Sequence, residues 1–413
     1  MYVFRRILRA FRLLLKYSLL LLLTILLLPL FNYIEPARYD FPASEAFKGS
    51  FWYNPYQGMD SAQWLPANFH MHSRAWGGLT NGADTRDHEV YDTYKKIGFG
   101  SIAISNYQKI NALYSDKAFY IPAYEHGYGI YKNHHLCLGA KKVVWYDLPY
   151  GQNIHHKQYI LNRLRPTTDI LSINHPSFFK GYMPEDFTRL TGYDGIEVLN
   201  GYRNSIPHWD SALSAGRPAF IFADDDMHDI SVPDEIGRRF LVINSPSNSR
   251  SDILSALKSG KAYGVYYQGD KGESLTEKSE KINHLPVITT FDVKNDTLSL
   301  TIDSTAYEVR FYGQHGRLLK KKGGIRKAFY ALQEDDSYVR AVILFPTRSS
   351  HEGLQYFLNP VLRSKDGKKP PMPQAEINQT GTWLSRIGLS LVALTFIWLS
   401  ARIIKWRKEK RKS

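Results

Sequence analysis

Residues 68–72 read Asn-Phe-His-Met-His, an apolar, strand-like run that ends in a His-x-His pair. Five later strand-like runs also carry metal-binding side chains, at 121–125, 133–136, 172–176, 195–198 and 224–228, and the last of these holds an Asp-x-His pair. The six runs are spread over about 160 residues, so only a fold can bring them together. A barrel of parallel strands would do so, because all strand C-termini then lie on one face.

The length and cysteine content limit the class of protein. A chain of 413 residues with 43% apolar residues is long enough for two to three domains and a large core. The single cysteine, Cys137, excludes an intramolecular disulfide but does not exclude an oxidising compartment.

The formal net charge of +14 is concentrated at the two ends of the chain. Residues 1–16 contribute +5 and residues 402–413 contribute +6, so the body between them is nearly balanced. A nucleic-acid-binding protein needs a basic stripe on its folded body. We therefore expect no nucleic-acid partner.

Each basic end flanks an apolar run. Residues 17–34 carry no charge, and the run 387–401 extends to 383–404 if Arg386 and Arg402 reach the two membrane interfaces. The positive-inside rule then predicts an inner-membrane protein with both termini in the cytoplasm and a periplasmic body. The alternatives are a cleaved signal peptide, although no small-x-small site follows the first run, and an amphipathic or dimerising tail helix, although the second run is apolar all round.

Strand-like and helix-like runs alternate between residues 66 and 265, which favours a parallel α/β architecture. Beyond residue 285 the pattern becomes β-rich, with a period-two run at 297–302 and a hairpin formed by 306–312 and 318–321. We predict a basic end and transmembrane helix (1–34), a linker (35–65), a barrel (66–284), an antiparallel β-domain (285–362), a linker (363–382), a second transmembrane helix (383–404) and a basic tail (405–413).

The histidine and carboxylate residues indicate a metal site only when they are taken together. His70 and His72 point to the same face of a strand, yet taken alone they could be two surface histidines. Imidazole and carboxylate groups recurring at successive strand ends are the donors of borderline divalent metals. A carboxylate that bridges two such ions would activate a water and polarise a substrate oxygen.

The order of these residues resembles the polymerase and histidinol phosphatase (PHP) domain, and residues 66–362 resemble its carbaryl-hydrolase-like (CehA/McbA) branch. The resemblance includes the segments 256–263 and 356–360. It implies a distorted seven-stranded (β/α) barrel with a metal centre at the strand C-termini, followed by the small antiparallel β-domain.

The resemblance also implies a ligand set. The implied metal ligands are His70, His72 and Asp226 for a first ion, Glu125 as the bridge, and His135 and His175 for a second ion. His135 is preferred to His134 because the family motif places the ligand directly before the apolar run 136–138. Asp225 is the alternative to Asp226, but only Asp226 forms the Asp-x-His spacing with His228.

Many PHP proteins hold a third ion, and this chain departs from their pattern. Ser105-Asn106-Tyr107 stands where they have Thr-Asp-His, and after His72 no acid occurs until Asp84. We therefore expect one or two divalent ions (Zn, Mn or Fe). His228 and Tyr107 are then predicted to be acid–base groups, and Glu197 to orient a ligand histidine or to meet the substrate.

Loop cations supply candidate substrate contacts. Arg74, Lys180 and Arg203 follow site strands and could bind an anionic substrate, together with Asn200; a loop cation can equally be only solvated.

These features predict a membrane-anchored, extracytoplasmic, metal-dependent hydrolase that uses an activated water on a phosphoester or on a carboxylic or carbamate ester. The substrate would be a small-molecule or lipid-headgroup ester. The alternative is a degenerate, non-catalytic barrel that binds a ligand or partner beside the membrane. A third hypothesis, an adhesive β-domain, has no aromatic stripe or metal motif in its favour.

Overall fold

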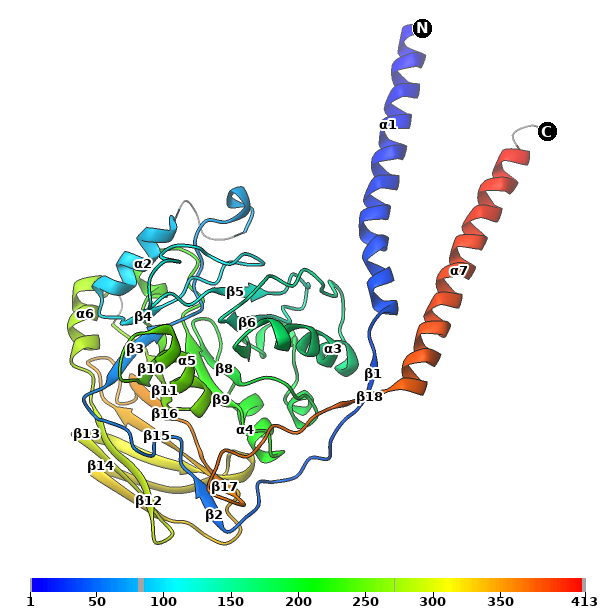
Figure 1. The fold of residues 1–413 in the computed structure, drawn as a ribbon. Helices are drawn as coiled ribbons and strands as arrows, with labels where there is room; N and C mark the ends of the chain where they lie inside the picture. Colours follow the sequence, from blue (N-terminus) through cyan, green and yellow to red (C-terminus); the bar gives the residue numbers. More distant parts are fainter. Residues whose placement is uncertain (1, 81–84, 271, 411–413) are drawn as a thin grey trace.

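The computed structural model describes residues 2–80, 85–270 and 272–410, which form a mixed α/β body with one long helix at each end (Figure 1). The α-helices are α1 Tyr2–Leu27, α2 Asp87–Lys96, α3 Ile154–Leu164, α4 Ile206–Ser214, α5 Arg250–Ser259, α6 Leu275–Asn283 and α7 Gln379–Glu409. Short 3-10 helices cover Leu28–Ile34, Trp76–Gly78, Arg165–Thr167, Phe178–Lys180, Pro184–Thr188, Pro233–Glu235 and Gln314–Gly316. The mixed α/β class predicted from the sequence is confirmed.

One sheet of the body contains five buried strands in the order β5-β6-β7-β8-β9. They are β5 Ala123–His126, β6 His135–Leu138, β7 Ile170–Ile173, β8 Gly195–Asn200 and β9 Phe220–Asp224. β7, β8 and β9 are parallel, but β6 is antiparallel to both of its neighbours, so the expectation of parallel strands throughout is wrong at β6. Only residues 127–134 separate β5 from β6, and a parallel crossover needs about a dozen residues or more.

The other large sheet has eleven strands, with β12-β13-β15-β16-β11-β10-β3-β4 as its main path and β14, β17 and β2 attached. Its strands are β2 Phe51–Tyr53, β3 Trp64–Asn68, β4 Ser101–Ile102, β10 Arg239–Asn244, β11 Ala262–Tyr267, β12 Ile288–Lys294, β13 Thr297–Tyr312, β14 Leu318–Ala331, β15 Tyr338–Phe345, β16 Leu354–Leu358 and β17 Val361–Ser364. β3 and β4 are parallel, and the remaining pairs are antiparallel.

The strands expected to form one barrel are divided between these two sheets. β3 and β4 belong to the larger sheet, whereas β5 to β9 form the smaller one. The isolated bridges Met71↔Met227 and Tyr107↔Glu125 join the two groups, both of them beside predicted ligands. A continuous seven-stranded barrel is therefore not shown.

The predicted hairpin after residue 285 is present, since β13 and β14 pair on either side of residues 313–317. The runs 297–302 and 306–312, expected to be two strands, form the single strand β13. Its register with β14 shifts between Thr301 and Ala306, an irregularity that bends a strand without ending it.

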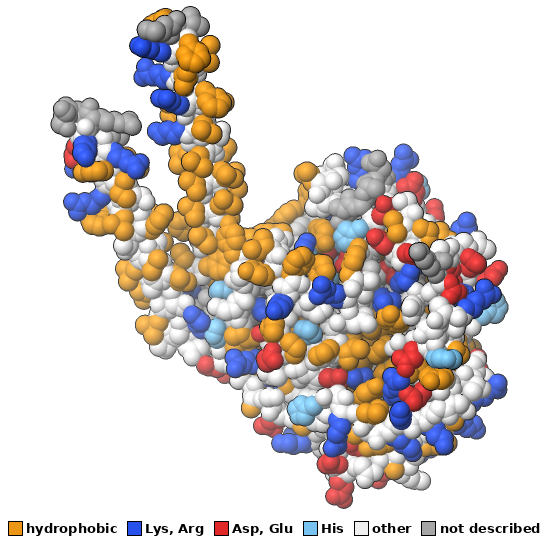
Figure 2. Space-filling model, turned by 180° about the vertical axis from the view of Figure 1, so that it is seen from behind, with side chains coloured by type: hydrophobic (Ala, Val, Ile, Leu, Met, Phe, Trp, Pro, Cys, Tyr) orange, Lys and Arg blue, Asp and Glu red, His pale blue; other side chains and the backbone are white. Residues whose placement is uncertain are grey.

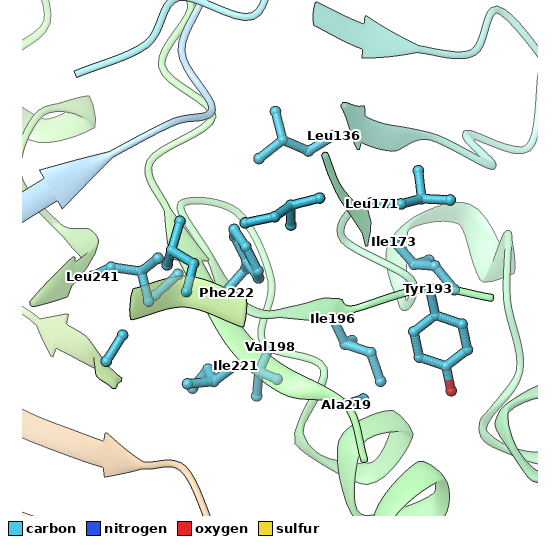
Figure 3. Close-up of a cluster of buried hydrophobic side chains, with 14 of the residues drawn as sticks. Leu136, Leu171, Ile173, Tyr193, Ile196, Val198, Ala219, Ile221, Phe222 and Leu241 are labelled. Atoms are coloured by element: carbon cyan, nitrogen blue, oxygen red, sulfur yellow. The ribbon is translucent and has the colours of Figure 1, made fainter. Parts of the chain in front are cut away.

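The strands of the smaller sheet are held by an apolar core (Figure 3). Leu136, Ile173 and Ile196 of β6, β7 and β8 are buried together with Phe222 of β9, and Trp209 of α4 belongs to the same cluster. Full burial of each such side chain contributes roughly 1.5–3 kcal/mol. This packing fixes the strand ends from which the candidate site residues project.

The two terminal helices project from the same side of the body (Figure 1), and both are long and apolar enough to cross a membrane. Hydrophobic side chains cover both helices, with Lys and Arg near their free ends (Figure 2). The predicted linkers run together, because β1 Arg38–Asp40 pairs with β18 Glu376–Asn378 and β2 pairs with β17. α7 is longer than the predicted span 383–404 and begins directly after β18.

Candidate metal centre

Four of the predicted ligands converge on one point. His70 Nε2 lies 3.2 Å from both Glu125 Oε2 and Asp226 Oδ1. His72 Nε2 lies 3.3 Å and 3.2 Å from the same two oxygen atoms. The two histidines directly follow β3, the glutamate lies in β5, and the aspartate follows β9. Strand ends from both sheets thus supply one buried group of two imidazoles and two carboxylates.

A second group shares the carboxylate of Glu125. The other carboxylate oxygen of Glu125, Oε1, lies 2.9 Å from His134 Nδ1 and 3.1 Å from His175 Nε2. All three side chains are buried. Glu125 therefore lies between the two groups, which is the arrangement expected of a bridging carboxylate.

The sequence-based preference for His135 over His134 is not met by this geometry. His135 Nε2 lies 2.7 Å from the Tyr182 hydroxyl, and its Nδ1 lies 3.4 Å from His126 Nδ1. Successive residues at a strand end point in opposite directions, so only one of two adjacent histidines can face Glu125. β6 begins at His135, and the residue just before the strand is the one that faces the centre.

Polar side chains behind the two groups hold the candidate ligands in place. Glu197 Oε1 lies 2.9 Å from His70 Nδ1, and Glu197 Oε2 accepts a hydrogen bond from the backbone N–H of His175 at 2.6 Å. Asn200, predicted to contact substrate, donates to Asp226 Oδ2 at 3.2 Å. Such partners fix the tautomer and the orientation of a metal ligand.

The buried donors fit a divalent cation. Among the described residues, His70 Nε2 and Glu125 Oε2 have no hydrogen-bond partner, although both are buried. Buried polar atoms are normally satisfied, and orphaned ones mark a site for an ion or a water. Burial opposes protonation of His70, but the surrounding carboxylates outweigh it and raise its pKa well above the ordinary value. A set of imidazole and carboxylate donors with spare lone pairs matches Zn, Mn or Fe.

The backbone is strained at two of these positions. His175 has φ +26° and Asp226 has φ +52°, values that non-glycine residues rarely adopt. Hydrogen bonds hold both residues there: Asp226 N–H donates to the His70 carbonyl at 2.8 Å, in addition to the bond from His175 to Glu197. Strain of this kind persists where the surroundings impose it and clusters at functional sites.

His228 and Tyr107 lie at the outer side of the first group. His228 Nδ1 lies 2.7 Å from the Asp226 carbonyl and can only donate to it, which leaves Nε2 as an acceptor. Burial lowers the pKa of His228 to about 4, so the ring is neutral at pH 7. The Tyr107 ring stacks on His72 with centroids 4.7 Å apart, and burial raises its pKa.

Among the described residues, His228 does not belong to any group of side chains that could together hold a metal ion. Asn106, in the Ser-Asn-Tyr segment, donates from Nδ2 to the hydroxyl of Ser73, the residue directly after His72, at 2.7 Å. Asp84 lies outside the described residues.

The predicted substrate cations lie in exposed loops. The Arg203 guanidinium stands 5.8 Å from the centre of the Phe178 ring, which in turn packs 5.7 Å from the His175 ring. Arg74 donates to the Gly77 carbonyl at 3.5 Å, and Lys180 is exposed. Sequence reasoning did not single out Lys132, whose amine lies 5.7 Å from the Tyr107 ring centre, although Lys132 directly precedes the run 133–136.

Comparisons with known proteins add little to this geometry. No protein-family model matches the chain, and no curated protein sequence matches it. A solved structure from Bacteroides vulgatus, described as a two-domain protein containing a predicted PHP-like metal-dependent phosphoesterase, aligns with 77% of this chain and 99% of its own, at 13% identity and a TM-score of 0.38. This similarity is too low to transfer a fold family or a function. The fold and the site themselves define a mixed α/β protein with a buried His–carboxylate centre.

Proposed function

We propose that this chain is a metal-dependent hydrolase of the PHP type, in its carbaryl-hydrolase-like branch, that acts on a phosphoester. The observation that carries the proposal is the position of Glu125, whose two oxygen atoms face two separate groups of histidines. Carboxylic and carbamate esters are the second substrate class, because the same centre would serve them.

The chain's residues have distinct tasks in this proposal. His70, His72 and Asp226 would hold a first divalent ion, and His134 and His175 a second, with Glu125 common to both. When bound, such ions polarise a substrate oxygen and lower the pKa of a water. Glu197 would accept a hydrogen bond from the Nδ1–H of His70, and this tautomer leaves the Nε2 lone pair for coordination.

Proton transfer is assigned to the outer side of the centre. His228 presents a neutral Nε2, fixed by the bond from Nδ1 to the Asp226 carbonyl, and can take a proton from a water or return it to a leaving group. The Tyr107 hydroxyl stays protonated and can donate a hydrogen bond to charge that develops on the substrate.

We further propose that α1 and α7 anchor the body in the inner membrane with both termini in the cytoplasm and the centre in the periplasm. The support is the apolar length of both helices and the excess of Lys and Arg near their free ends.

The test is a metal and substrate screen on the full-length protein in detergent. We expect one or two equivalents of Zn, Mn or Fe per chain and hydrolysis of at least one phosphomonoester or phosphodiester. His70→Ala/His72→Ala should lose both, whereas substitution of His284, an exposed histidine directly after α6, by Ala should lose neither. Turnover by the double variant at the wild-type rate would refute catalysis at this centre.

A further inference from the structure

Aromatic side chains connect the candidate ligands to the protein surface. His72 stacks on Tyr107, and the Trp76 indole N–H donates to the Tyr107 carbonyl at 2.8 Å. The Trp76 ring in turn lies 5.6 Å from the Trp145 ring, which is 58% exposed. The walls of the centre therefore continue outward as apolar, exposed rings.

A second series of rings leaves the centre on the side of His175. Its ring lies 5.7 Å from Phe178, which lies 4.7 Å from Phe179. Phe179 is 60% exposed. Phe178 also lies 6.2 Å from Tyr202, whose ring is 6.1 Å from His228.

Exposed apolar side chains are concentrated in the segments that carry these rings and in the adjoining loops. Outside the terminal helices and the 3-10 helix Leu28–Ile34, nine of the fifteen large hydrophobic side chains that are exposed among the described residues lie in the loops 76–79, 128–131 and 179–183, or at Trp145 and Tyr202. We call these loops and the two rings the apolar rim. Contiguous exposed apolar surface of this kind marks an interaction site.

The rim adjoins the body end of α1. Ile130 N–H donates to the Pro149 carbonyl at 2.9 Å, and the next residue, Tyr150, donates through its hydroxyl to the Leu26 carbonyl inside the apolar run. Asn133 donates to the Gly181 carbonyl, which ties the loop 128–131 to the loop 179–183. In Figure 1 the loops around β5 and β6 face the direction in which both helices extend, and Figure 2 shows hydrophobic side chains on the body beside the helix bases.

Basic side chains are interspersed with these rings. Lys132 and Arg203 stand over Tyr107 and Phe178, and Lys141 and Lys142 are exposed in the segment that leads to Trp145. Tryptophan, tyrosine and basic residues together are the composition of a membrane-interface surface, and the cations attract anionic headgroups.

We propose that the apolar rim docks on the bilayer that the helices cross, and that the substrate is the phosphoester headgroup of a membrane-embedded amphiphile. The hydrolytic step rests on the proposed catalytic centre, and the docking rests on the proposed anchoring by α1 and α7 but not on catalysis. In that step a water oxygen bonds to phosphorus, the bond to the leaving alcohol oxygen breaks, one water proton passes to that oxygen, and the other leaves with the phosphate product.

The docking is tested without catalysis, on the full-length chain in nanodiscs of phosphatidylethanolamine and phosphatidylglycerol. A nitroxide is attached at Ile130→Cys or, as the matched control, at Phe329→Cys; both parent side chains are exposed, and Cys137 is fully buried. We expect the label at 130 to be more accessible to oxygen than to a soluble nickel complex, and the label at 329 to show the reverse. Aqueous behaviour at both positions would overturn the docking.

The substrate class is tested with Ile130→Glu and Phe329→Glu, on phosphatidylglycerol in the same nanodiscs and on water-soluble glycerophosphoglycerol. Ile130→Glu should lower hydrolysis of the bilayer lipid about tenfold and leave the soluble diester unchanged, because a buried charge weakens interfacial binding. Phe329→Glu should change neither. Equal effects of Ile130→Glu on both substrates would overturn the substrate class. A wild-type protein that hydrolyses no ester would overturn the proposed function. The nitroxide experiment would still decide the docking.

Discussion

Asp225 and Asp226 are adjacent in the chain but have different surroundings. Asp225 accepts hydrogen bonds from the backbone N–H groups of Gly237, Arg238 and Arg239 and from the Tyr94 hydroxyl, at 2.7–2.8 Å. Asp226 faces the imidazoles of the centre. The Asp-x-His spacing predicted Asp226 as the candidate ligand, and in the structure Asp225 accepts hydrogen bonds from the backbone and from Tyr94.

Asp225→Ala should therefore destabilise the protein by more than about 3 kcal/mol, because it leaves several buried donors unsatisfied. Asp226→Asn should remove metal and lower stability far less. Thermal unfolding of both variants in detergent, without added metal, checks the contrast. A melting temperature of Asp225→Ala within a few degrees of the wild type would show that these donors find other partners.

The two adjacent histidines before and at the start of β6 give a second prediction at the residue scale. His134→Ala should lower bound metal by up to one equivalent, since its Nδ1 faces Glu125. His135→Ala should retain the metal, because its imidazole faces Tyr182. Elemental analysis of the two purified variants decides between them, and the opposite result would restore the family-based choice of His135.

His134 and His135 also show how much of this site the sequence alone can predict. Glu125 and His175, which the family resemblance implied as ligands, lie within 3.1 Å of each other in the structure. The choice between His134 and His135 depends on the register at which β6 begins, and a shift of one residue reverses the facing side chain. Register is set by pairing with β5 and β7, which are distant contacts invisible in a local pattern.

At the scale of elements, the direction of β6 was missed for the same reason, because pairing with distant strands decides it. Strand and helix alternation was read correctly, but it carries no information on whether a neighbour pairs parallel or antiparallel. Because β6 is reversed, its first residue lies at the edge where β5 and β7 end, and this brings His134 to the centre from the start of a strand rather than from its end.

A buried ion pair links the smaller sheet's helix α4 to β15 of the larger sheet. Arg340 donates from Nε and Nη2 to the two carboxylate oxygens of Asp210, both at 2.8 Å, and its guanidinium lies 5.2 Å from the Trp209 ring. Removal of one partner of such a pair leaves an uncompensated buried charge and costs roughly 3–5 kcal/mol.

Asp210→Leu should accordingly lower the melting temperature markedly without changing the metal content of the folded fraction. The double variant Asp210→Leu/Arg340→Leu should recover much of the loss, since apolar pairs often replace buried ion pairs at little cost. Thermal unfolding of the single and double variants measures the coupling. If the double variant is no more stable than the single, the uncompensated charge is not the cause of the loss.

At the scale of the whole molecule, the two ends of the chain meet outside the body. β1 pairs with β18 directly before α7, and Arg386 of α7 donates to the Glu35 carbonyl at the end of the first apolar segment. Charge and hydropathy predicted both helices, but this pairing of two linkers more than 300 residues apart could not be seen in the sequence. It places the body ends of α1 and α7 near each other.

This arrangement leads to a topology prediction. If both helices cross the inner membrane, epitope tags at residue 1 and residue 413 should survive protease added to intact spheroplasts, while the body between them is degraded. The excess of Lys and Arg at both free ends opposes their transfer to the periplasm. Lysed spheroplasts, in which both tags should be lost, are the control. Loss of only the C-terminal tag in intact spheroplasts would show that α7 lies on the periplasmic side instead of crossing, and the β1–β18 pairing would then hold it along the bilayer surface.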